Sequence, residues 1–79
     1  MGEKEFCRKV GSIIRKLRCE KCSDSLCVFA EKNNIPSSTL SRIEIGENEA
    51  QLHNLKKIAD GLGMSLSALF AYIEASLAK

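Results

Sequence analysis

The chain has 79 residues, of which 44% are hydrophobic and 28% charged, and its formal net charge is +2. These values are ordinary for a globular chain and predict one small domain over residues 1–79, without low-complexity segments or repeats. No window is long and apolar enough to span a bilayer, and the charged segment 1–18 is unlike a secretory signal. We therefore expect a cytoplasmic protein with no membrane partner.

Amphipathic spacing predicts a first helix over residues 3–18. Its apolar stripe consists of Phe6, Val10, Ile13, Ile14 and Leu17. A second helix should follow, capped by Ser23, Asp24 or Ser25. It should stop at Asn34, because asparagine tolerates the left-handed conformation found at helix ends.

A third helix is predicted to begin at Pro36 or Ser37, since proline lacks the N–H group that would be unpaired at a helix start. It should end near Ile45, with Gly46 as the stop. The apolar groups on one side of this helix come from Ile35, Leu40 and Ile43.

Leucine-rich spacing predicts two further helices, the fourth ending at Gly63 and the fifth capped by Ser65. Their inner stripes are Leu52, Leu55, Ile58, Ala59 and Leu62 in the fourth helix, and Leu66, Leu69, Phe70, Ile73 and Leu77 in the fifth. No stretch alternates with a period of two residues. We therefore expect an all-α domain in which five helices form a compact bundle.

Residues 30–44 are the most informative stretch, because they predict two short helices around a tight corner. Ala30 lacks the bulk that would push apart two steeply crossing helices, and Asn34 suits the turn. Such a corner directs the polar side chains of the third helix away from the core, namely Ser37, Ser38, Ser41 and Arg42. This is how a helix-turn-helix presents a recognition helix to the major groove, so we expect double-stranded DNA as the partner.

The order of these motifs resembles the lambda-repressor-like, Cro/C1-type (XRE family) helix-turn-helix domains over residues 10–70. The basic segment 14–18, the segment 38–44 and the run 55–66 carry the resemblance. It implies a lambda-repressor-like bundle with the helix-turn-helix in helices two and three, and a regulator of transcription. The size is most similar to the restriction–modification controllers, although the family also includes phage-type repressors and antitoxins.

The resemblance also implies roles for individual residues. It places base contacts at Ser37, Ser38 and Arg42, backbone or phosphate contacts at Thr39 and Ser41, and a structural salt bridge between Arg18 and Glu44. Arg42 is the strongest base reader, because its guanidinium can hold guanine O6 and N7 together. The N-termini of helices attract phosphates, and the side chains best placed to assist there are Ser25, Asn48 and Asn54.

The fifth helix predicts a homodimer, because it continues after the other helices have ended and carries a second, small-residue side. We expect Tyr72, Ile73 and Leu77 at the dimer interface, in the extension 71–79. A two-fold dimer would set two recognition helices about 34 Å apart and require a palindromic operator. The alternative is a monomer in which Ile73 and Leu77 fold back onto the first helix near Phe6.

The cysteines favour a second alternative, a metal- or redox-responsive regulator. Cys19 and Cys22 have the spacing of metal ligands and Cys27 follows, but His53 lies far along the chain and no second pair exists. We therefore expect ordinary thiols, no metal and no cofactor. No catalytic motif appears either, so we expect neither an enzyme nor a small-molecule substrate. A protein-interaction module such as an antitoxin is the competing class.

Overall fold

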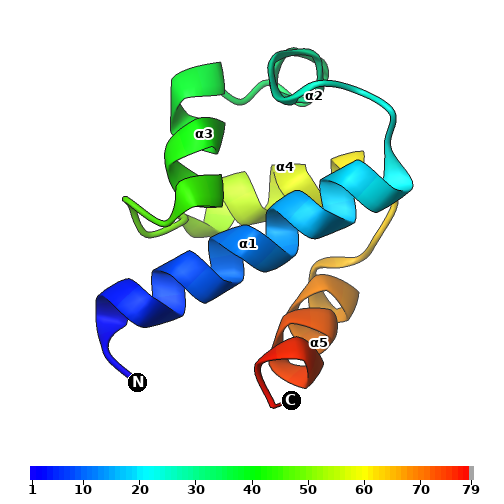
Figure 1. The fold of residues 1–79 in the computed structure, drawn as a ribbon. Helices are drawn as coiled ribbons and strands as arrows, with labels where there is room; N and C mark the ends of the chain where they lie inside the picture. Colours follow the sequence, from blue (N-terminus) through cyan, green and yellow to red (C-terminus); the bar gives the residue numbers. More distant parts are fainter. Residues whose placement is uncertain (79) are drawn as a thin grey trace.

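The computed structural model describes residues 1–78, which fold into five helices and no strand. The helices are α1 (Glu3–Lys21), α2 (Leu26–Lys32), α3 (Ser37–Ile45), α4 (Leu52–Gly61) and α5 (Leu66–Leu77). Helix α1 crosses in front of α4, with α2 and α3 on one side of α1 and α5 on the other (Figure 1). The all-α prediction is confirmed. Within residues 1–78 no single helix is long and apolar enough to cross a membrane, although α4 and α5 together satisfy that test across a 95° bend.

Helix α1 ends later than predicted, at Lys21 instead of residue 18. The extra turn forms because no glycine or proline interrupts it, and the N–H of Cys22 still donates to the carbonyl of Arg18 at 2.9 Å. Helix α2 is capped by Ser25, whose hydroxyl accepts from the N–H of Val28 at 3.3 Å. Of the three predicted caps, the structure therefore uses the one next to the first helical residue.

The other helix ends follow the turn residues. Gly46 has a φ of 80° and closes α3, as predicted. Helix α4 ends at Gly61, two residues before the predicted stop, and Gly63 has a φ of 71° in the turn that follows. Ser65 caps α5 by accepting from the N–H of Ala68 at 3.1 Å. Within the predicted extension 71–79, position 79 lies outside the described residues.

The core lies where all five helices meet. It consists of Ile14, Leu17, Phe29, Ala30, Ile35, Leu40, Ile43, Ile58, Ala59, Leu62, Leu69 and Ile73. Three residues of the predicted apolar stripes are instead exposed: Phe6, Leu52 and Phe70. Phe6 and Leu52 stand in the first turn of their helices and are 47% and 64% exposed, and Phe70 on α5 is 37% exposed.

Two glycines bring the C-terminal half of α3 unusually close to α1. A Cβ on Gly11 would lie 2.7 Å from the carbonyl oxygen of Glu44 and closer still to that of Ile43. A Cβ on Gly46 would lie 2.5 Å from the Cα of Arg8. Because these contacts are with backbone atoms, no side-chain rotation could make room for a larger residue. The position of α3 on α1 therefore depends on glycine at both places.

Candidate nucleic-acid interface

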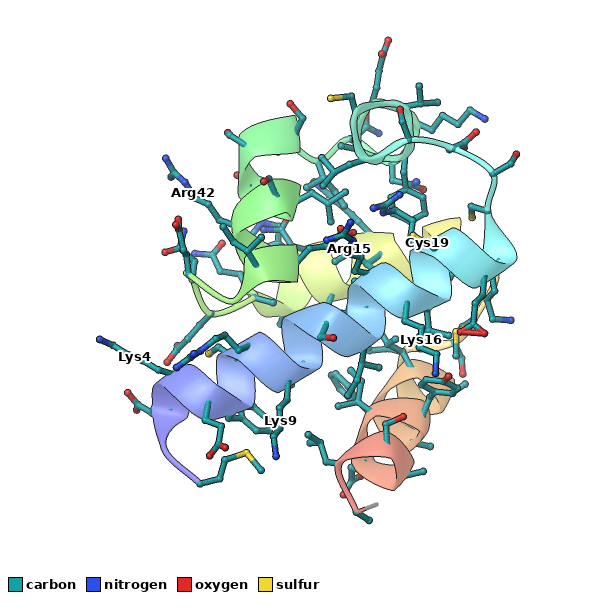
Figure 2. The ribbon with its side chains drawn as sticks, viewed as in Figure 1. Lys4, Lys9, Arg15, Lys16, Cys19 and Arg42 are labelled. Carbon is teal, nitrogen blue, oxygen red and sulfur yellow. The ribbon has the colours of Figure 1, made fainter. Side chains whose placement is uncertain are left out.

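Helix α3 has one side in the core and one side in solvent. Leu40, Ile43 and Glu44 are buried, which fixes the orientation of the helix about its axis. Ser37, Ser38 and Arg42 are exposed, and Thr39 and Ser41 are half-buried at the edges of the exposed side. Figure 2 shows Arg42 extending from α3 away from the other helices. The side chains predicted to read bases therefore share one accessible surface.

The corner between α2 and α3 is built on Ala30 and Asn34. Ala30 is fully buried and its carbonyl accepts from the N–H of Ile35 at 2.9 Å. Asn34 has a φ of 57°, the left-handed conformation predicted for this position. Its carbonyl also accepts from the Nζ of Lys57 at 2.9 Å, which ties the corner to α4. The angle between α2 and α3 is thus fixed by the hydrogen bond within the corner and by the hydrogen bond from α4.

A buried ion pair joins α1 to the end of α3. The Nε of Arg18 donates to Oε2 of Glu44 at 2.8 Å, and its second terminal nitrogen donates to Oε1 at 3.0 Å. The two side chains are only 9% and 2% exposed. The remaining nitrogen of Arg18 donates to the carbonyl of Asp24 at 3.2 Å, just before the cap of α2. One guanidinium therefore connects α1, α3 and the start of α2.

The electrostatics of this pair keep Arg18 charged. The hydrogen bond with Glu44 raises the pKa of Arg18 above its ordinary value, and this outweighs the lowering by burial. The two parallel hydrogen bonds also align the plane of the guanidinium with that of the carboxylate, so that the pair fixes the relative orientation of the two side chains. Both side chains are too buried to meet a ligand, and the pair holds α3 in place on α1.

The predicted phosphate contacts differ in accessibility. Ser25 is exposed at the N-terminus of α2, where it also serves as the cap. Asn48 is exposed in the loop between α3 and α4. Asn54 lies in the first turn of α4 and is only 7% exposed, which leaves little of its side chain for a phosphate. Ser25 and Asn48 are therefore the better placed of the three.

The residues predicted for the dimer interface lie mostly within the monomer. Ile73 is 6% exposed and belongs to the core, while Tyr72 and Leu77 are half-buried against it. Ile73 also lines an apolar hollow of about 330 Å³, together with Phe6 and Phe70; α1, α4, α5, the end of α3 and the loop after α3 surround it. This packing of Ile73 resembles the alternative in which the last helix folds back onto α1.

The comparison with known proteins decides the family. The helix-turn-helix family HTH_3 matches residues 14–69, which include α2, the corner and α3. The chain belongs to the helix-turn-helix family. The resemblance to Cro/C1-type domains is thereby confirmed, and the protein is a DNA-binding transcriptional regulator and not an enzyme.

The chain is similar to known helix-turn-helix regulators both in sequence and in fold. The chain is 41% identical to the control protein C.MunI of Mycoplasma sp over 66 residues, covering 84% of this chain and 89% of the relative. A crystal structure of the clp gene regulator ClgR from Corynebacterium glutamicum superposes with a TM-score of 0.79 at 25% identity, covering 92% of this chain and 77% of that one. A second ClgR structure gives a TM-score of 0.75 at 24% identity, covering 90% and 91%, and supports the fold alone.

The cysteines of this helix-turn-helix domain are not gathered into a site. Cys19 and Cys27 are exposed, whereas Cys7 and Cys22 are half-buried. The thiol of Cys22 faces the carbonyl of Gly61 at 3.8 Å. Within residues 1–78, no group of three or more histidine, cysteine or acidic side chains could hold a metal ion. The geometry therefore gives the metal-sensing alternative no support.

Sequence reasoning missed two features of the helix-turn-helix surface. Ile45 was assigned only as the end of α3, yet it is exposed on the same side as Ser38 and Arg42. The spacing leaves Arg15 and Lys16 outside the apolar stripe of α1 without separating them, and Figure 2 places Arg15 on the side of α1 next to α3, whereas Lys16 points the opposite way. The seven-residue spacing from Ser38 to Ile45 could have revealed the first feature, but the second depends on how α1 packs.

Proposed function

We propose that this protein is a sequence-specific transcriptional regulator that binds a palindromic operator as a homodimer. Helix α3 enters the major groove, with Ser37, Ser38 and Arg42 at the base edges. The observation that supports this most is the accessible polar side of a helix whose other side is held by the buried Arg18–Glu44 pair. The expected phosphate contacts come from Thr39, Ser41, Ser25 at the start of α2, and Asn48 in the loop after α3.

Arg42 is the residue on which sequence preference depends most. We expect Arg42→Ala to weaken binding to the cognate operator by about 1–3 kcal/mol and to relax the preference at one base position per half-site, because a bidentate contact to guanine is lost. The measurement is a titration of fluorescently labelled cognate and scrambled duplexes, after the operator has been selected from random DNA.

Lys16→Ala is the matched control, since it removes one exposed positive charge from the side of α1 that faces away from α3. It should leave the ratio of cognate to scrambled affinity unchanged. If Arg42→Ala weakens both duplexes equally, Arg42 contacts a phosphate and the assignment as a base reader is wrong.

The similarity to C.MunI supports a narrower role. C.MunI is a control protein that shares 41% of aligned residues with this chain. We propose that this chain is likewise a controller protein of the restriction–modification type, acting at a promoter. Genes for a methyltransferase and an endonuclease beside its own gene would support this role. A toxin gene in that place would favour an antitoxin instead.

The exposed aromatic side chains of α1 and α5 support the homodimer but shift its interface. Phe6 and Phe70 are 47% and 37% exposed at the hollow that Ile73 also lines, and burying the part still exposed contributes about 1 kcal/mol each. We propose that the partner covers this hollow. The two-fold axis then passes near α5, and the exposed side of α3 stays free for DNA, because neither Ser38 nor Arg42 lines the hollow.

A pair of charge substitutions tests this interface. We expect the intact chain to sediment as a dimer at micromolar concentration, and Phe70→Glu to sediment as a monomer, because a charge would be buried in the apolar contact. Ala75→Glu, on the exposed small-residue side of α5, should remain dimeric. Dissociation by Ala75→Glu alone would locate the interface on that side, and a monomeric intact chain would contradict the dimer.

A further inference from the structure

Ile45 is a large apolar side chain exposed on the surface proposed to face DNA. It is 52% exposed at the last residue of α3, although the core residue Ile43 stands only two positions before it. Exposed aliphatic side chains are common, and one alone carries no meaning. Ile45 differs from an isolated exposed side chain because it lies beside the residues proposed to contact bases.

Ile45 shares one side of α3 with Ser38 and Arg42. At 3.6 residues per turn, these positions fall within about 60° of one another around the helix axis. With a rise of 1.5 Å per residue, Ser38 and Ile45 are about 10 Å apart along the axis. This length corresponds to about three base-pair steps of 3.4 Å and fits within a major groove about 12 Å wide.

The position of Ile45 is also rigid. The preceding residue, Glu44, is held by Arg18 through two hydrogen bonds of 2.8 and 3.0 Å. The following residue, Gly46, abuts the backbone of Arg8. With its backbone held on both sides, Ile45 starts from a defined position on α3, as a base-reading contact requires.

We propose that Ile45 packs against the C5-methyl group of a thymine and thereby sets the operator preference at that position. This inference rests on the proposed function, because it requires α3 to lie in the major groove. The thymine methyl is the apolar group that the major groove offers, and apolar side chains read it. Ile45 does not line the hollow that the dimer partner is proposed to cover, so that contact does not need this side chain.

The test is a binding titration on operators in which single thymines are replaced by deoxyuridine, which lacks only the methyl group. Burying one such group is worth about 0.8 kcal/mol, or about fourfold in affinity. We expect the wild-type protein to lose about fourfold at one thymine per half-site. Ile45→Ala should bind the thymine and deoxyuridine operators equally at that position, and Ile45→Val should keep most of the discrimination.

Val28→Ala is the matched control, because Val28 is an exposed aliphatic residue on α2 and not on α3. It should discriminate as the wild type does. A wild-type protein that binds its operator with equal affinity after every thymine replacement overturns the inference alone. An Ile45→Ala variant that still binds the thymine operator more tightly than the deoxyuridine operator also overturns the inference alone. A wild-type protein for which the selection yields no preferred duplex overturns the proposed function and the inference together.

Discussion

Glu44→Ala is expected to destabilise the domain by about 3–5 kcal/mol, because it leaves the buried guanidinium of Arg18 without its partner. At about 0.05–0.15 kcal/mol per residue, a domain of this size has only about 4–12 kcal/mol of total stability. The substitution should therefore unfold a large fraction of the protein. Arg18 cannot escape this cost by losing its proton, because a guanidinium stays protonated in proteins even without its acidic partner.

Urea denaturation of three variants measures this effect. Glu44→Ala alone should show the large loss, whereas the double variant Arg18→Met with Glu44→Leu should recover most of it, because it removes both charges together. Lys56→Ala breaks an exposed pair, in which Lys56 lies 2.7 Å from Asp60, and should cost less than about 0.5 kcal/mol. A loss from Glu44→Ala as small as that of Lys56→Ala would show that Arg18 is hydrated in the variant.

The contribution of Arg18 should not vary with pH near neutrality. A group whose pKa is raised on folding contributes its full stability below its unfolded value and loses it only as the pH rises through the folded value. For arginine both values lie far above neutral pH. The stability difference between wild type and the double variant Arg18→Met with Glu44→Leu, which removes both charges, is therefore expected to stay constant from about pH 6 to pH 9 in the same urea titration.

The helices and their order could be predicted from the sequence because their signals are local. Apolar spacing, the serine cap at Ser65 and the glycine at Gly46 each act within a few residues, and the structure uses them as expected. The end of α1 was predicted too early, since segment 18–22 contains no residue that stops a helix. The exposure of Phe6 and Leu52 could not be predicted, because it depends on which element lies beyond each helix start.

The candidate site was predictable to a similar extent. The exposed side of α3 follows from the buried positions of Leu40 and Ile43, so Arg42 could be assigned from spacing. The pairing of Arg18 with Glu44 spans 26 positions and came from the family resemblance, because no local pattern encodes it. The burial of Asn54 depends on how α4 packs, and no sequence signal indicated it.

The strongest constraint that the sequence did not indicate is Gly11. On an isolated helix, replacing glycine by alanine stabilises by about 1 kcal/mol. Here the added methyl group would overlap the carbonyl oxygens of Ile43 and Glu44, which are backbone atoms and cannot rotate away. Separating α1 from α3 would also stretch the hydrogen bonds between Arg18 and Glu44. The tertiary contact thus predicts that Gly11→Ala lowers the stability of the domain, whereas helix propensity predicts that it raises it.

We expect the tertiary contact to dominate, so that Gly11→Ala destabilises the domain by about 3 kcal/mol, at the upper end for overpacking. Thermal unfolding should show a decrease of more than about 10 °C, since each kcal/mol shifts the melting temperature of a small domain by about 4–8 °C. Gly63→Ala meets no neighbour but has a φ of 71°, and should cost about 1 kcal/mol through backbone strain alone. Gly2→Ala meets nothing either, at a φ of −79°, and should leave the melting temperature unchanged. A Gly11→Ala variant that melts above the wild type would mean that α1 and α3 do not approach as closely in solution.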